Sequence, residues 1–267
     1  RRLQGRWVEL LYPAALEDHR RSSAAARERY VDSADLVYAT FMQWVGAEPD
    51  GDGRLVIAMI PPPDAEASGR GWLGRKGIEV YETISGYPVE LEFSAATGRM
   101  DTLVVHEMAH NFDLAWRVAP ETNDPAHFFT AVLPRLYERH QRWRPAASAP
   151  PGDTELQFRT PEEIIARFGY HRFRWLAEDT DRSVQQCVLE GECGFPSGNI
   201  LAAALVFRAS ESQPPEFLSK YLAAARQLAS GNLDIARGTV SLDIQLLALS
   251  RARGEDLLCL AQPFGWT

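Results

Sequence analysis

The sequence predicts an α+β fold, with a mixed strand and helix N-terminal lobe over residues 1–120 and a mainly helical C-terminal lobe over residues 121–267. Three observations lead to this prediction. Segments with the apolar periodicity of strands and of helices alternate up to about residue 120. A helix from Gly98 to Arg117 carries apolar residues on most sides, so we expect it to be buried. Beyond this helix the apolar positions repeat with helical spacing alone.

In the N-terminal lobe, Arg6 to Tyr12 reads as a strand and Ser22 to Trp44 as a helix. Arg54 to Ile60 is rich in Val and Ile, which is typical of a buried strand. After three prolines and a glycine-rich loop, another strand is expected from Gly77 to Thr83. Apolar and acidic residues alternate from Pro88 to Phe93, so this segment is expected to be a half-buried strand.

The C-terminal lobe contains five segments with helical spacing and helix-start signals, which are Pro125–Arg142, Pro161–Leu176, Asn199–Ala209, Pro215–Ala229 and Val240–Arg253. Residues Pro145 to Asp153 are rich in proline and mark a linker or a surface loop.

The charge and the hydropathy exclude two classes of partner. With 36 acidic and 28 basic residues the formal charge is -8, so no general attraction to nucleic acid is expected. The longest apolar run, Asn199 to Phe207, is much shorter than the roughly 20 residues of a membrane span. Cys187 and Cys193 can form a local disulfide and leave Cys259 unpaired, which favours a secreted or periplasmic protein; two free thiols are the alternative.

The buried helix carries a pattern with a specific chemistry. His106 and His110 are four residues apart and therefore share one helix face, about 6 Å from each other, where both imidazoles can hold one Zn²⁺. Glu107 completes the HExxH pattern, in which the glutamate takes a proton from a metal-activated water. Two histidines and a glutamate are costly to bury without a metal or other partners. A chance match on a structural helix is the alternative.

Around these residues the sequence resembles the zincin metallopeptidases, over about residues 50–170. The resemblance implies a zincin-like fold, in which a strand-rich lobe ends in the motif helix and a helical lobe supplies the third zinc ligand. The metzincin form is excluded because Trp116 occupies the position of its third histidine. A glutamate from a later helix, as in the gluzincins, is therefore implied by the resemblance.

Three glutamates compete for this third-ligand role. Glu163 lies in a segment that resembles the third-ligand helix of the anthrax lethal factor group, although Thr160 and Glu163 also form a helix capping box. Glu121 has a spacing compatible with the enhancin-like, mucin-targeting branch, but nearby prolines favour a loop there. Glu138 lies on a predicted helix, where an exposed surface residue is the simpler interpretation.

Other polar residues receive supporting roles. Asp113 is too far along the helix from His106 to bind the same ion, so it is expected to accept a hydrogen bond from a ligating imidazole; a buried ion pair with an arginine is the alternative. Tyr170, with His171 beside it, is the expected donor to the developing oxyanion; Tyr137 and His140 take this role if Glu138 is the ligand, and ordinary surface residues are the alternative. His19 and His127 have no motif context and are interpreted as structural.

The predicted function is zinc-dependent hydrolysis of peptide bonds in a protein or glycoprotein, with Glu107 as the general base. The segment Gly77–Tyr81 is a candidate edge strand for binding such a peptide, or an ordinary sheet strand. A non-catalytic binding or regulatory module with the same fold is the alternative function.

Overall fold

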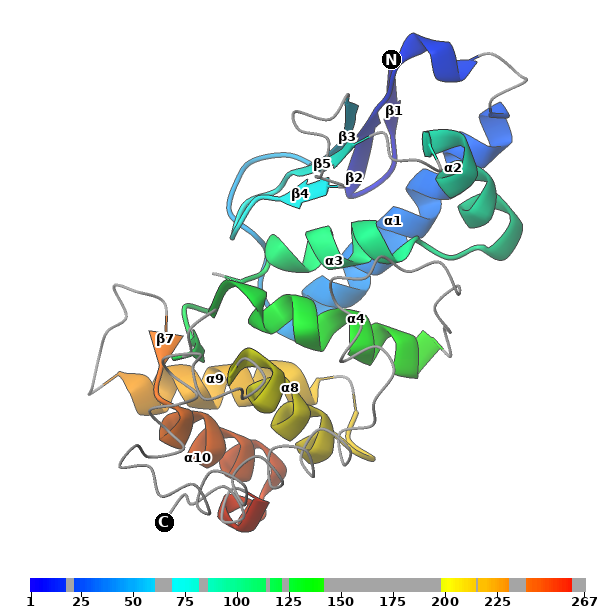
Figure 1. Cartoon of the computed structure of the whole chain (residues 1–267). Helices are drawn as coiled ribbons and strands as arrows, with labels where there is room; N and C mark the ends of the chain where they lie inside the picture. Colours follow the sequence, from blue (N-terminus) through cyan, green and yellow to red (C-terminus); the bar gives the residue numbers. More distant parts are fainter. Residues whose placement is uncertain are drawn as a thin grey trace, which may run out of the picture.

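The computed structural model describes residues 1–17, 22–60, 69–81, 86–113, 116–121, 125–141, 198–214, 216–230 and 239–260. Over these ranges it is a mixed α+β structure, as the sequence predicts. The strands of the main sheet gather at one end of the molecule, and the C-terminal helices lie at the other (Figure 1).

The described residues form one five-stranded sheet, made of β1 (Arg2–Gln4), β2 (Val8–Leu11), β3 (Leu55–Ile60), β4 (Gly69–Gly71) and β5 (Ile78–Tyr81). Their order in the sheet is β1-β2-β3-β5-β4. The central pairs β2–β3 and β3–β5 are parallel, whereas β1 and β4 run antiparallel to their neighbours. The two edge strands are therefore β1 and β4, and β4 is the edge strand that contacts the helix with the HExxH pattern (residues 102–110). The expectation that Gly77–Tyr81 forms this edge is wrong, because β5 is paired on both sides.

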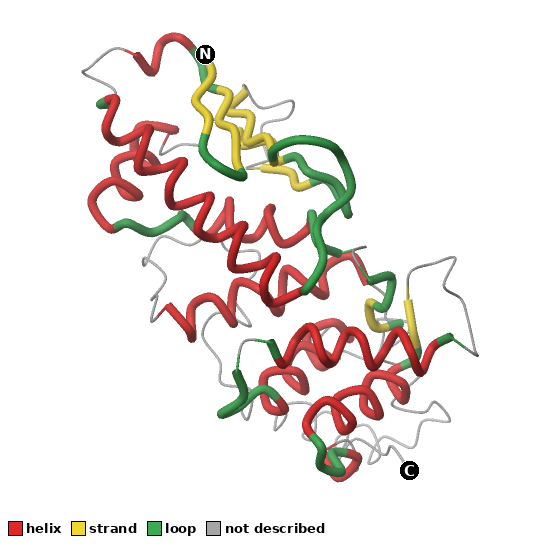
Figure 2. The backbone as a smooth tube through the Cα atoms, turned by 180° about the vertical axis from the view of Figure 1, so that it is seen from behind, coloured by secondary structure: helices red, strands yellow, loops and turns green. Residues whose placement is uncertain are grey.

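Seven α-helices are described, namely α1 (Ala24–Val45), α2 (Gly86–Thr97), α3 (Thr102–His110), α4 (Phe128–Gln141), α8 (Gly198–Ala209), α9 (Phe217–Ala229) and α10 (Leu242–Arg253). Short 3-10 turns are η1 (Ala14–Glu17), η2 (Pro125–His127) and η5 (Leu258–Leu260). The two-residue strands β6 (Ala119–Pro120) and β7 (Thr239–Val240) pair in parallel. Seen from behind, the strands of the main sheet lie together near the N-terminus, and the short strands β6 and β7 lie apart from them, near the C-terminal helices (Figure 2).

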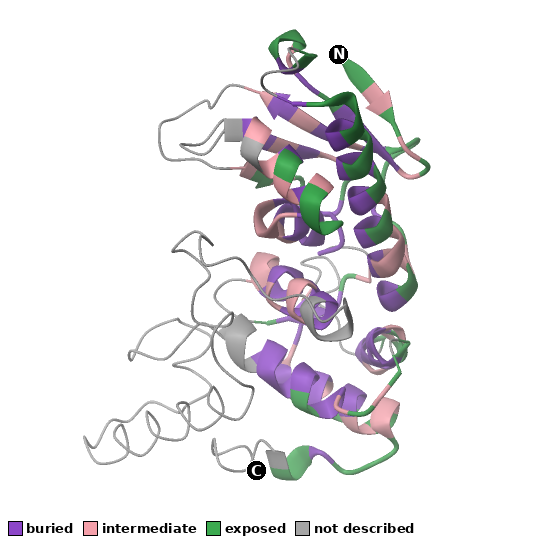
Figure 3. Cartoon of the chain, turned by 90° about the vertical axis from the view of Figure 1, so that its right-hand side faces the viewer, coloured by how far each residue is buried: buried purple, intermediate pink, exposed green. Residues whose placement is uncertain are grey.

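Helix α1 organises the N-terminal part. It begins because the Ser23 hydroxyl accepts a hydrogen bond from the N–H of Ala26, and it ends at Gly46, whose φ of 72° favours glycine. Along its whole length α1 has one buried side and one exposed side (Figure 3). The buried side contacts the sheet, α2, α3, α4 and α9.

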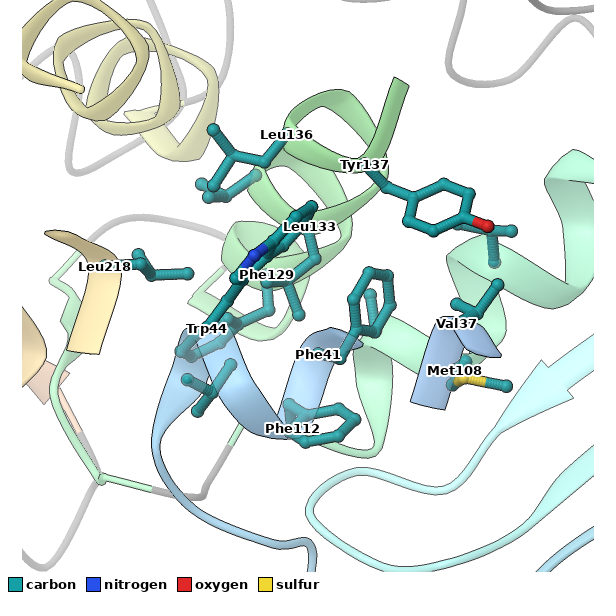
Figure 4. Close-up of a cluster of buried hydrophobic side chains, with 14 of the residues drawn as sticks. Val37, Phe41, Trp44, Met108, Phe112, Phe129, Leu133, Leu136, Tyr137 and Leu218 are labelled. Carbon is teal, nitrogen blue, oxygen red and sulfur yellow. The ribbon is translucent and has the colours of Figure 1, made fainter. Parts of the chain in front are cut away.

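Aromatic residues join α1 to the helices that form the candidate site. Phe41 of α1 packs edge-on against Phe112, with ring centroids 5.8 Å apart, and against Tyr137 of α4 at 6.2 Å. Phe129 and Leu133 of α4 lie in the same cluster (Figure 4). Because this core is closely packed, it fixes the position of α4 relative to α3.

Two expected elements differ in the structure. Pro88–Phe93 belongs to α2 and is not a strand. The buried helix expected over Gly98–Arg117 is shorter, since α2 ends before Gly98, which has a φ of 65°, and α3 begins only at Thr102. The expected strand at Arg54–Ile60 is confirmed as β3. No helix within the described ranges combines the length and the apolar character that a membrane crossing requires.

Candidate metal centre

The motif residues lie on α3, whose rotation is fixed by its apolar residues. Asp101 caps the helix by accepting a hydrogen bond from the N–H of Val104 at 2.9 Å. Four residues of the helix are completely buried, namely Val104, Val105, Met108 and Ala109. Glu107 and His110 are also buried, at 7% and 8% exposure, and His106 is half-buried.

Three histidines converge at one place. The ring centroids of His106 and His110 are 5.1 Å apart, and that of His127 lies 4.9 Å from His110 and 6.2 Å from His106. One ring nitrogen from each of the three lies within 4.8 Å of the others, so the set can hold a metal ion. Among the described residues, no other group of His, Cys, Asp or Glu meets this criterion.

From the sequence His127 is interpreted as structural, whereas the structure places it in the histidine group. It ends the η2 turn directly before α4, seventeen positions after His110, where no periodic pattern connects the two. One compositional signal existed. The chain has six histidines, and three of them fall between positions 106 and 127.

Asp113 joins the motif helix to the turn that carries His127. Its Oδ2 lies 2.9 Å from Nδ1 of His110, and its Oδ1 accepts a hydrogen bond from the N–H of Phe129 at 3.2 Å. The carbonyl oxygen of Ala126 is also 3.1 Å from the same Nδ1. Asp113 is 2% exposed, so water competes little for these bonds. This one carboxylate therefore contacts a candidate ligand and the start of α4.

These contacts determine which nitrogen of His110 is available to a metal. Burial lowers the pKa of His110 to about 4, and charge on His106 acts in the same direction, while Glu107 opposes it. The imidazole is therefore neutral at physiological pH. Both neighbours of Nδ1 are oxygen acceptors, so Nδ1 carries the proton and Nε2 keeps its lone pair. Neutral imidazole with one free nitrogen is the form that binds a metal.

Glu107 is held by the edge strand. Its Oε2 accepts a hydrogen bond of 2.5 Å from the N–H of Gly71 in β4. Strand and helix approach so closely here that a Cβ atom on Gly71 would lie 2.1 Å from the backbone oxygen of Glu107. Position 71 therefore requires a glycine, because any side chain there would clash with the backbone of α3. The close contact between β4 and α3 also sets the position of the Glu107 carboxylate.

An open cleft of about 470 Å³ lies against this group of residues. It is lined by His110, Ala126 and His127 together with residues 70–73 and Arg75. Two of the three candidate metal ligands, His110 and His127, are thus accessible to a molecule that enters the cleft.

Of the three glutamates proposed from the sequence as third ligands, Glu121 alone has a described side chain, and it is not part of the histidine group. Glu121 is exposed, and its N–H donates a hydrogen bond of 2.7 Å to the carbonyl of Val240. Glu138 lies on α4, but its side chain is outside the described residues. Glu163 and Tyr170 lie outside them entirely, as do Cys187 and Cys193. Cys259 is exposed and free.

Comparison of the chain with protein-family models and with curated protein sequences gives no match in either case.

Proposed function

We propose that this protein is a zinc-dependent peptidase whose ion is held by His106, His110 and His127. The observation that carries the proposal is the convergence of three imidazoles beside an open cleft. Imidazole nitrogen suits Zn²⁺, and three protein ligands leave a coordination position for a reacting water, as in catalytic zinc sites. In this proposal His127 takes the place that the gluzincin resemblance gives to a glutamate.

Glu107 supplies the proton transfer in this mechanism. A zinc ion provides Lewis-acid activation of water near neutral pH. The carboxylate of Glu107 accepts the proton released as the water attacks the peptide carbonyl, and it then delivers that proton to the departing amine. The bond from Gly71 N–H engages Oε2 of this carboxylate. Among the described residues, the N–H of Gly71 is the one group that donates a hydrogen bond to the Glu107 carboxylate. The other oxygen, Oε1, is therefore left to accept and release the proton.

The arrangement of the sheet edge supports a peptide substrate. The motif helix lies against β4, the edge strand, and the cleft follows the chain from Arg70 onward. An extended peptide fits such a strand edge. The zincin-like fold suggested by the sequence is consistent with a motif helix between a sheet and a set of later helices, and it forms part of this proposal. Tyr170 remains the predicted oxyanion donor.

Metal analysis tests the donor set. The purified protein is expected to bind about one equivalent of zinc, measured by mass spectrometry of the metal. Single substitutions of His106, His110 or His127 to alanine are expected to reduce zinc binding by at least tenfold, because each removes a ligand. If H127A retains zinc and E163A loses it, the third ligand is Glu163 and not His127.

Peptide cleavage tests the catalytic role. Glu107→Gln is expected to retain zinc but to lower kcat/KM on a broad peptide library by about 10²–10⁴-fold, the range of general-base catalysis. Glu92→Gln is the matched control, because Glu92 is an exposed glutamate on the neighbouring helix α2. If the wild-type protein binds zinc and cleaves no peptide, the non-catalytic binding module is the better assignment.

A further inference from the structure

One wall of the cleft is built from β4 and the loop that follows it. This wall consists of residues 70–73 together with Arg75. These residues line the same cleft as His110 and His127, and Gly71 lies directly against His110, so whatever binds against them lies beside these two candidate metal ligands. The chemistry of these side chains therefore bears on which substrates enter.

The loop is attached to the end of the motif helix by one backbone hydrogen bond and two hydrogen bonds from the side chain of Asn111. The N–H of Gly74 donates to the carbonyl of His110 at 3.0 Å. The side-chain amide of Asn111 donates to the carbonyls of Trp72 and Gly77, at 3.0 Å and 2.9 Å. Asn111 is completely buried, so these bonds are protected from water. The loop is consequently preorganised next to the ligands.

Two large apolar side chains remain exposed on this fixed loop. Trp72 is 47% and Leu73 is 45% exposed. The indole ring of Trp72 lies against Gly77, where a Cβ atom would be only 3.0 Å from the ring. Single exposed apolar residues are common on proteins, but two adjacent ones on a rigid cleft wall offer a binding surface.

Two arginines flank these apolar residues. Arg70 and Arg75 are exposed, and neither has an ion-pair partner within the described ranges. Glu79 lies opposite Arg70 in the sheet register, but its carboxylate accepts a hydrogen bond of 2.5 Å from the hydroxyl of Tyr81. Asp50 lies opposite Arg75 at an isolated bridge. Neither arginine forms an ion pair with these carboxylates in the described part of the chain, so both guanidinium groups can bind an anionic ligand.

We propose that this cleft selects polypeptides that carry an acidic side chain next to an apolar one close to the scissile bond. Arg70 and Arg75 bind the carboxylate by charge-assisted hydrogen bonds, and Trp72 and Leu73 pack against the apolar neighbour. This inference rests on the proposed peptidase function and names its substrate class. Arg70 and Arg75 are specificity residues in this scheme and take no part in the proton transfer.

The test compares pairs of peptides that differ by Glu or Gln at one position, scanned on both sides of the cleavage site. The zinc-loaded protein is expected to cleave the Glu peptide with a kcat/KM about tenfold or more above that of the Gln peptide at the preferred position. The double variant Arg70→Gln, Arg75→Gln is expected to reduce this ratio below threefold. The ratio should also fall at high salt, since the arginines are exposed.

Arg251→Gln is the matched control, because Arg251 is an exposed arginine on α10 and does not line the cleft. This variant is expected to keep the wild-type ratio. Equal cleavage of Glu and Gln peptides at every position by the wild-type protein would overturn the inference and leave the peptidase proposal intact.

A binding measurement separates the two proposals. The anisotropy of fluorescent Glu and Gln peptides is measured with the zinc-loaded Glu107→Gln variant, with and without the two arginine substitutions. Binding that prefers Glu and depends on the arginines supports the acidic selectivity, even if the wild-type protein cleaves nothing. Binding with no preference for Glu contradicts it.

Discussion

At the scale of single residues, Gly71 is the position where the site tolerates least change. A methyl group there would lie 2.1 Å from the backbone oxygen of Glu107 and 2.9 Å from Cβ of His110. Gly71→Ala must therefore push β4 away from α3 and carry the donor to Glu107 with it. We expect a loss of roughly 1–3 kcal/mol in the free energy of unfolding, together with weaker zinc binding and slower peptide cleavage.

Gly98→Ala is the control for this substitution. Gly98 has a φ of 65° and no neighbouring atom within 4 Å of an added Cβ. Its replacement is expected to cost about 1–2 kcal/mol through backbone strain and to leave zinc affinity unchanged. Urea unfolding and zinc titration of both variants check this. Equal zinc affinity in the two variants would mean that the contact of β4 with α3 does not shape the site.

At the scale of elements, the junction of α2 and α3 buries two carboxylates together. Burial raises the pKa of Glu90 to about 8, and the charge of Asp101 adds to the effect. The pKa of Asp101 is raised by burial to about 6, although backbone N–H groups at the start of α3 partly oppose this. One oxygen of each carboxylate is buried without a hydrogen-bond partner among the described residues. The hydroxyl of Tyr30 is buried in the same way, and both acidic charges raise its pKa further.

This junction predicts a stability that decreases as the pH rises. Between about pH 4 and pH 8 the unfolded chain releases these protons while the folded protein retains more of them, so the free energy of unfolding falls with pH. Glu90→Gln removes the larger part of the effect. We expect this variant to be more stable than wild type by about 1–3 kcal/mol at pH 8, with a much smaller difference at pH 4. Urea unfolding at pH 4 and at pH 8 measures the free energy of unfolding of each variant. The control Glu92→Gln changes an exposed glutamate and should have the stability of the wild type at both pH values.

The packing of α3 and α4 explains which site residues can be predicted from the sequence and which cannot. His106, Glu107 and His110 could be recognised because their geometry is local to one helix. His127 could not, because only the packing of α4 on α3 brings it near, and that packing depends on Asp113 and the aromatic core. The alternation from Pro88 to Phe93 was misleading because Glu90, a polar position, is directed into a buried junction in α2. The strand rule assumes that polar residues face water.

At the scale of the whole molecule, the C-terminal helices hold the segment that leads to His127. The side-chain amide of Gln245 on α10 donates to the carbonyl of Val118 at 2.7 Å, and the hydroxyl of Tyr221 on α9 hydrogen-bonds to the same side chain. Arg226 donates to the carbonyl of Trp116 at 3.0 Å. Residues distant in sequence thus position residues 116–121 before the chain enters η2.

Gln245→Leu tests this attachment. The substitution leaves the Val118 carbonyl and the Tyr221 hydroxyl without their buried partner, so we expect a loss of about 2–4 kcal/mol in the free energy of unfolding. Zinc binding should weaken less than in H127A, since no ligand is removed. Thermal unfolding and zinc titration measure the two effects, and exposed Arg251→Gln should leave both at the wild-type value. A stability unchanged from wild type would show that these helices do not support residues 116–121.

The two bonds of Asp113 make the proposed ion and the packing of α4 thermodynamically linked. The same carboxylate contacts His110 and the first turn of α4, which follows His127 directly. An ion that draws His110 and His127 together therefore favours the packed arrangement of the two helices, and firm packing strengthens ion binding by the same free energy. Removal of the ion by a chelator should accordingly lower Tm, by an amount that grows with the zinc concentration of the reference sample.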